Sequence, residues 1–156
     1  MFLNINANNA ILLHEFIHFA LTSLVAIFFW LKFKDKRLIL AAFIFGFLID
    51  VDHWFDYFAY FGLRGNLKNF FIVETYVHGS GKTFILLHGW EYLIVFWLIG
   101  KFIGKRFKIK SLEWVITIAY LAHLLWDNFS FFHHPLAYSF IYRLVNNFSL
   151  KSFSGF

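Results

Sequence analysis

The sequence predicts an all-α protein: an integral membrane bundle of four transmembrane helices with a short C-terminal helix. The first observation is composition, since 60% of the 156 residues are apolar and 15% are charged, whereas a soluble domain is about 45–50% apolar and about 25% charged. The second is that 25 phenylalanines exceed what the core of a small soluble domain can bury. An ordinary soluble domain and a disordered chain are therefore excluded. The absence of cysteine also excludes a disulfide-stapled module.

Four apolar segments each approach or exceed the length of about 20 residues that a helix needs to cross a bilayer. They are residues 10–31, 38–60, 83–100 and 112–132. Each is expected to be helical, because a backbone in lipid must satisfy its own hydrogen bonds. A short amphipathic helix is expected over residues 136–144. No repeat or linker divides the chain, so residues 1–156 are predicted to form a single domain.

Two short connections, residues 32–37 and 101–110, are strongly basic. Together they hold nine of the fourteen Lys and Arg residues: Lys32, Lys34, Lys36, Arg37, Lys101, Lys105, Arg106, Lys108 and Lys110. Cytoplasmic loops carry such an excess. We therefore expect an integral protein of the inner or plasma membrane, with both termini and the 61–82 loop outside. This topology accounts for the net charge of +5 without nucleic-acid binding.

Ionisable side chains lie inside the apolar segments, where they are costly and indicate a functional site by default. The acidic ones are Glu15, Asp50, Asp52, Asp56, Glu91 and Asp127, and the histidines are His14, His18, His53, His88 and His123. At a rise of about 1.5 Å per residue, these clusters lie about 14–26 Å from the basic end of each helix. Four helices of alternating direction would thus place them in one outward-facing layer.

The spacing within each segment favours metal ligation. His14 and His18 are four residues apart, as are His123 and Asp127, so each pair would share a helix face. Facing helices of a bundle can hold metal sites built from such pairs. Imidazole and carboxylate without thiolate suit zinc, iron, manganese or nickel. We favour zinc, with one or two ions. The predicted ligands are His14, His18, Asp50, Asp52, His53, His88, His123 and Asp127.

The remaining candidates have roles around that site. Glu91 or Glu15 would act as the general base, and His133 and His134 could bind an anionic headgroup. Simpler explanations stay open for each cluster: a solvated helix end for residues 50–53, one buried His–Glu pair for His88, and a histidine oriented by a carboxylate for residues 123–127. Residues 79–83 are not a phosphate-binding loop, because Tyr76 stands where that motif needs glycine.

Taken in order, the clusters resemble the bacterial and archaeal membrane-bound metal-dependent hydrolases, a family described in part as LexA-binding, inner-membrane-associated hydrolases. The matching residues are His18, then Asp50, Asp52 and His53, then His88, then His123 and Asp127. Two departures stand out: Ile49 replaces the family's proline, and His88 stands alone where the family has a histidine pair. The resemblance implies metal-dependent hydrolysis, with a lipid or lipid-linked phosphoester as the substrate.

Three other functions compete with hydrolysis. His14-Glu15-Phe16-Ile17-His18 matches the H-E-x-x-H motif, in which two histidines bind zinc and the glutamate is the base of a metalloprotease. The same clusters could line a pathway for a divalent cation or a proton, although the almost purely apolar inner stretches 24–31 and 38–47 disfavour it. A membrane assembly or regulatory subunit would use the metal structurally, with every coordination position filled by protein.

Overall fold

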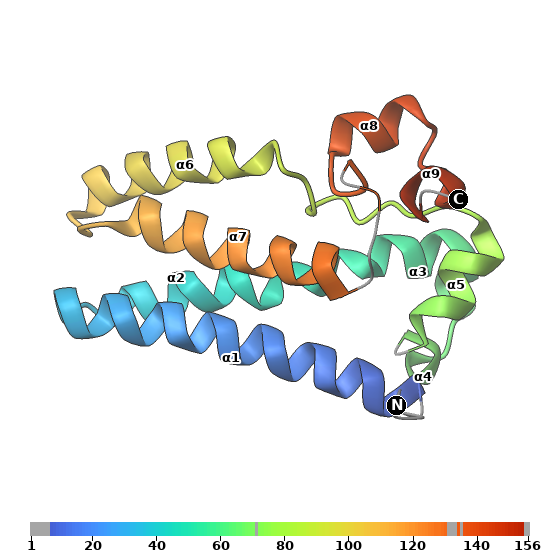
Figure 1. Cartoon of the computed structure of the whole chain (residues 1–156), viewed down its shortest axis with the longest axis horizontal. Coiled ribbons are helices and arrows are strands. Elements are labelled where there is room, and N and C mark those ends of the chain that lie inside the picture. The colour runs from blue at the N-terminus through green and yellow to red at the C-terminus, as the bar shows by residue number, and fades with distance from the viewer. Residues whose placement is uncertain (1–6, 71, 131–133, 135, 155–156) are drawn as a thin grey trace. The chain divides into compact units, whose positions relative to one another are not determined.

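The computed structural model describes residues 7–70, 72–130, 134 and 136–154. In this part of the chain every named element is a helix, which confirms the all-α prediction (Figure 1). The α-helices are α1 (Ala7–Phe33), α2 (Arg37–Gly46), α3 (His53–Phe61), α4 (Leu67–Phe70), α5 (Val73–Ser80), α6 (Tyr92–Phe107), α7 (Leu112–Ser130), α8 (Phe140–Val145) and α9 (Leu150–Ser154). The 3₁₀ helices η1 (Leu48–Asp52) and η2 (Gly62–Arg64) flank α3.

The chain forms two compact units, described separately below. The first unit comprises residues 1–48 and 96–123, and the second comprises residues 49–95 and 124–156. The chain passes from one to the other after η1 begins, within α6 and within α7. The second unit contains all three predicted acidic ligands, Asp50, Asp52 and Asp127.

The first unit is built from α1, α2, the later part of α6 and the earlier part of α7. Helices α1 and α2 run side by side (Figure 1). The buried core is rich in small and aliphatic residues: Ala26, Phe29, Leu38, Ala41, Ala42, Leu112, Val115, Ile116 and Ala119. Small side chains let helix backbones approach closely, which is how helices pack where water does not drive their association.

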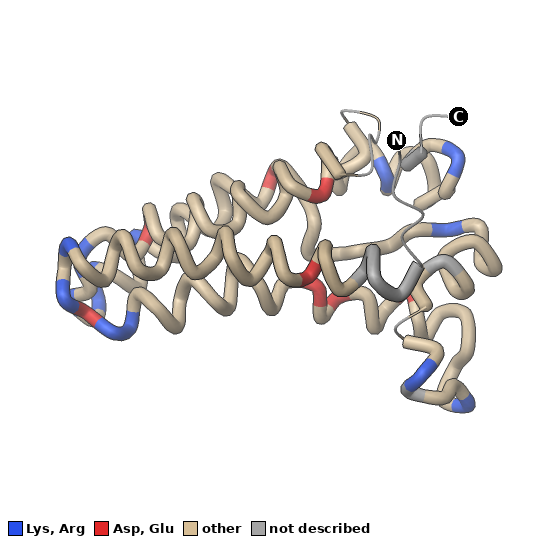
Figure 2. Tube along the Cα trace, turned by 60° about the horizontal axis from the view of Figure 1, so that its bottom comes forward, with Lys and Arg blue, Asp and Glu red and all other residues tan. Residues whose placement is uncertain are grey.

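The two basic connections meet at one end of the first unit, where Figure 2 shows Lys and Arg gathered. Arg37 joins them, because its guanidinium donates a hydrogen bond to the carbonyl oxygen of Phe107 at 3.2 Å. It also forms an ion pair with Asp35 at 2.7 Å, which lowers the pKa of that carboxyl. The expected 101–110 loop was too long: α6 continues to Phe107, and only residues 108–111 connect it to α7.

Two of the four predicted segments coincide with single helices, and the other two do not. Helices α1 and α7 match the first and fourth segments. The second is bent by 49° between Arg37–Gly46 and Leu48–Arg64. The third was wrong over residues 83–91, which are not helical; α6 begins only at Tyr92. Its local sequence is apolar enough for a helix, but the backbone there pairs with distant side chains instead.

Among the described helices, one is long and apolar enough to cross a membrane, Leu12–Phe33 of α1. A second qualifies if the bent pair is taken as a single span. Helix α6, with 16 residues, falls short of that length. Four membrane spans are therefore not confirmed, and one or two such helices are weak support for membrane association.

The second unit packs short helices around aromatic side chains. Tyr57, Tyr76 and Val77 are buried, and α3 lies against α5. Residues 61–82, expected to be a loop, contain η2, α4 and α5. The C-terminal helix, expected over residues 136–144, begins at Phe140, because the Ser139 hydroxyl accepts a hydrogen bond from the Tyr142 N–H at 3.1 Å and caps it. Helix α9 was not predicted.

Gly100 should be intolerant of any side chain. A Cβ atom at this position would lie 2.6 Å from the Glu113 Cα and 3.0 Å from the Glu113 backbone nitrogen. Gly100→Ala is therefore expected to force α6 away from α7 and to lower the free energy of unfolding by about 1–3 kcal/mol. Thermal unfolding in detergent measures this, with the exposed Leu98→Ala as control. An equal loss in both variants would contradict the close helix contact.

Candidate metal centre

A non-helical segment of the second unit, residues 82–91, carries His88 and is held in place by two buried carboxylates. We call it the His88 segment. Asp56 accepts hydrogen bonds from the backbone N–H groups of Phe84 at 2.6 Å and Ile85 at 3.0 Å. Asp52 accepts one from the Leu87 N–H at 2.6 Å. The two aspartates are four residues apart and fully buried. They satisfy backbone donors that a helix would have satisfied internally.

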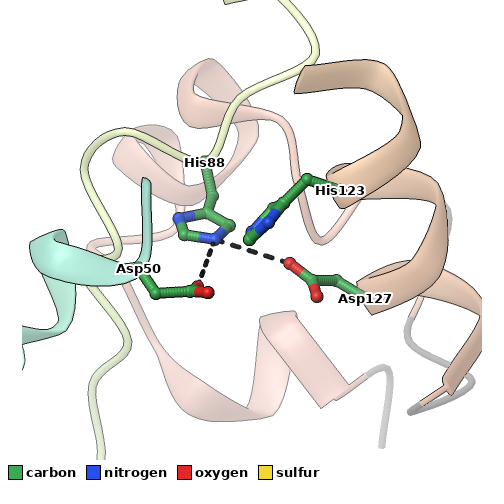
Figure 3. Close-up of side chains that lie close together, drawn as sticks. All are labelled: Asp50, His88, His123 and Asp127. Carbon is green, nitrogen blue, oxygen red and sulfur yellow. Dashed lines mark ion pairs between the residues drawn. The ribbon is translucent and has the colours of Figure 1, made fainter. Parts of the chain in front are cut away.

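Asp52 also orients the His88 side chain. Its Oδ2 lies 3.0 Å from the His88 Nδ1. An ionised carboxylate can only accept, so Nδ1 carries the proton in this hydrogen bond. The other ring nitrogen, Nε2, then lies 3.2 Å from an Asp50 oxygen and 3.4 Å from an Asp127 oxygen (Figure 3). A carboxylate behind a histidine whose far nitrogen faces further ligands is the usual arrangement of a metal-binding histidine.

Four side chains form a group that could hold a metal ion: Asp50, His88, His123 and Asp127 (Figure 3). Each offers one ligand atom, and these atoms lie within 4.8 Å of one another. His123 belongs to this group because it precedes Asp127 by one turn of the continuous helix α7. Asp50 is half-buried and the other three are buried. A divalent cation would offset the charge of the two carboxylates, which are close together.

The histidines of the first unit lie close to one another. The Nε2 atoms of His14 and His18 are 2.9 Å apart, so the predicted shared face of α1 is confirmed. The ring of buried His18 stacks on that of His123, with centroids 3.9 Å apart. The His123 Nδ1 donates to the Gly46 carbonyl oxygen at 3.2 Å. This bond assigns the proton to Nδ1 and leaves Nε2 as the coordinating nitrogen.

His53 lies at the edge of the group in the second unit. Its Nε2 is 3.9 Å from an Asp50 oxygen, and its side chain is half-buried. The Asp52 Oδ1 and the His53 Nδ1 are buried, and neither has a hydrogen-bond partner among the residues that the structure describes. Both residues were predicted as ligands. In this structure Asp52 supports His88 from behind, while His53 stands next to Asp50.

Glu91, a predicted general base, lies outside the group. Its carboxylate accepts hydrogen bonds from the Ser139 hydroxyl at 2.5 Å and from the backbone N–H groups of Phe140 at 3.0 Å and Ile141 at 3.3 Å. Burial raises the pKa of Glu91, but these hydrogen bonds outweigh burial and lower it overall. Glu91 is therefore a weaker base, and its hydrogen bonds stabilise the start of α8. The sequence argument relied on helical spacing from His88, and residues 88–91 are not helical.

The other predicted residues are placed as follows. Glu15 is half-buried on α1. His133 lies outside the described residues. The His134 Nδ1 accepts a hydrogen bond from the Leu136 N–H at 3.1 Å, and its ring stacks on Tyr142 with centroids 5.5 Å apart. His134 is thus engaged in the turn before α8 instead of facing the metal group.

Sequence reasoning missed two buried residues beside His88. The Tyr138 ring centroid lies 6.0 Å from that of His88, and Arg143 donates hydrogen bonds to the carbonyl oxygens of Ile85 and His88. Both come from the C-terminal region after the only proline. The available signal was Arg143, a single arginine in the otherwise apolar sequence of α8. Burying an arginine is costly unless it is paired, so it would have indicated a buried partner.

Comparisons of the chain with protein-family models, with curated proteins and with solved structures found no match. The resemblance to the membrane-bound metal-dependent hydrolases consequently stays a prediction from the order of the clusters. Function is argued below from the geometry around His88.

Proposed function

We propose that the protein is a membrane-embedded metal-dependent hydrolase. The observation that supports this most directly is the His88 imidazole, with Asp52 on Nδ1 and with Asp50 and Asp127 facing Nε2. Histidine and carboxylate donors occur together in catalytic zinc sites, and a catalytic site keeps one position open for water or substrate. The group as a whole would bind one divalent ion, with zinc favoured, and the His14–His18 pair offers donors for a second.

A divalent ion held by this group would supply Lewis-acid activation of a water molecule near neutral pH. The protein's own part is to orient His88 and to receive the proton. With Glu91 engaged by α8, the carboxylate best placed to receive it is Asp50, whose side chain is 21% exposed. Glu15 is the other candidate. The buried Asp127 would remain a ligand.

The membrane part of the proposal is a four-span bundle made of α1, the bent α2–α3 pair, α6 and α7. Its support is the row of exposed apolar side chains on the two helices that are too short or too polar to qualify alone: Ile94, Leu98, Phe102, Trp114, Leu125 and Phe129. Lipid would cover this surface. A site at membrane depth favours an amphiphilic substrate, a lipid or lipid-linked phosphoester, approached from the outer side while the basic connections face the cytoplasm.

A second candidate, an H-E-x-x-H metalloprotease, draws support from the His14–His18 contact. The contact shows that the two nitrogens can approach a common point, as two ligands of one zinc ion must. Transport of a cation is less favoured, because the core of the first unit around Ala26, Phe29 and Leu38 is apolar.

Metal content and hydrolysis test the proposal together. Protein purified in detergent is expected to hold at least one tightly bound transition-metal ion per chain and to cleave bis(p-nitrophenyl) phosphate or a phospholipid in mixed micelles. A chelator should abolish cleavage, and zinc or manganese should restore it. The double variant His123→Ala, Asp127→Ala should lose the metal, whereas Asp35→Asn, a carboxylate in a basic connection, should keep it.

Two outcomes would count against the proposal. Folded protein that takes up no zinc, iron or manganese would overturn the hydrolase and shift the buried carboxylates towards proton transfer. Metal-dependent cleavage of a peptide, without cleavage of any phosphoester, would favour the metalloprotease over the lipid hydrolase.

A further inference from the structure

Arg143 is a fully buried arginine whose described hydrogen bonds end on backbone carbonyls. Its Nη1 donates to the Ala137 oxygen at 2.7 Å, and its Nη2 donates to the Ile85 oxygen at 3.0 Å and to the His88 oxygen. The side chain is 1% exposed. A buried guanidinium is costly, so its retention requires compensating contacts. Here those contacts connect α8 directly to the His88 segment. Arg143 and His88 are 55 residues apart in the sequence.

Carboxylates hold the N–H groups of the same short stretch of backbone. Asp56 and Asp52 accept the N–H groups of residues 84, 85 and 87, while Arg143 donates to the carbonyls of residues 85 and 88. Ile85 shows how strongly this is imposed, because its φ is 29°, a value that a β-branched residue rarely adopts. Such a conformation persists only where the surroundings over-determine it.

The position of the His88 ring follows from this backbone. Two contacts set the position of the ring. Arg143 holds the His88 backbone through its carbonyl oxygen, and Asp52 contacts the ring at Nδ1. Asp52 fixes only the direction of the ring plane and the tautomer. The backbone contacts decide how far Nε2 reaches towards Asp50 and Asp127. A shift of well under 1 Å there would change the distances on which metal binding depends.

We propose that Arg143 is a positioning residue for the metal centre: it presents His88 by clamping the carbonyls of Ile85 and His88. The inference rests on the proposed metal-binding function. It makes metal affinity depend on α8, an element that contributes none of the four ligands. It also makes the dependence reciprocal, since a metal that binds the positioned His88 must stabilise the contacts that position it.

Titration of the detergent-solubilised full chain with Co²⁺ tests this, using visible absorption to report both affinity and ligand geometry. Arg143→Lys keeps the charge but cannot reach several carbonyls in a fixed fork. We expect it to weaken Co²⁺ binding by about 10- to 100-fold, as loss of a group that orients a ligand does, and to alter the absorption band. Tyr57→Phe is the control, since it removes a buried hydrogen bond to the Asn66 oxygen in the same unit and should leave affinity and band unchanged.

Hydrogen exchange of the wild-type chain gives a second test that needs no folded variant. Adding Co²⁺ should slow amide exchange in residues 140–145 as well as in residues 84–88. Wild-type Co²⁺ affinity and spectrum in Arg143→Lys, or protection confined to the His88 segment, would overturn the positioning role while leaving the metal centre intact. A wild-type chain that binds no Co²⁺ would instead overturn the metal centre and the positioning role with it.

Discussion

Replacing His88 with alanine is expected to abolish metal binding and hydrolysis. The ring nitrogens of His88 face three carboxylates, with Asp52 on Nδ1 and both Asp50 and Asp127 on Nε2. Without the imidazole, the remaining carboxylates would repel one another at close range, and an ion would lose its best-oriented donor. We expect metal affinity to fall by at least about 100-fold, with hydrolysis falling in proportion. Elemental analysis and isothermal titration measure this.

His78→Ala is the matched control for that experiment. His78 lies on α5, is exposed, and is ten residues earlier in the chain. It should retain full metal content. If His88→Ala kept the metal of the wild type, the metal would bind elsewhere in the protein. In the wild type, a proton on the His88 Nε2 would then balance the two facing carboxylates.

Replacing Asp56 with alanine is expected to have the largest effect on stability. Its two carboxylate oxygens accept the N–H groups of Phe84 and Ile85, and its side chain is 1% exposed. Alanine would leave both donors buried without an acceptor, at about 1–3 kcal/mol each. The free energy of unfolding should therefore fall by about 2–5 kcal/mol, and the His88 segment should become accessible to proteolysis.

Asp56→Asn separates the role of the hydrogen bonds from that of the side-chain volume. The amide keeps one acceptor oxygen and turns an NH₂ group towards the second backbone donor, so an intermediate loss is expected. Chemical unfolding followed by tryptophan fluorescence measures all three proteins. Equal stability of the wild type and Asp56→Ala would show that the His88 segment is held by other contacts.

The sequence argument succeeded where the signal was local. Helices α1 and α7 follow from long apolar runs, and the His14–His18 pair was placed on one helix face by its spacing alone. It failed where hydrophobicity did not decide backbone conformation. Residues 83–91 have the composition of a membrane helix, yet Asp52, Asp56 and Arg143 provide partners for their backbone groups, so the chain there is not helical.

The all-helical class and the chemistry of the donors can be predicted from the sequence, because apolar periodicity and side-chain type are properties of neighbouring residues. The role of each acidic residue, in contrast, depends on the tertiary structure. Asp52 meets His88 across 36 positions, Asp56 meets Phe84 across 28, and Glu91 meets Ser139 across 48. A carboxylate can be a ligand, a support for a histidine or a cap for a helix. The choice depends on which donors the fold brings within hydrogen-bonding distance, and no spacing along the chain encodes that.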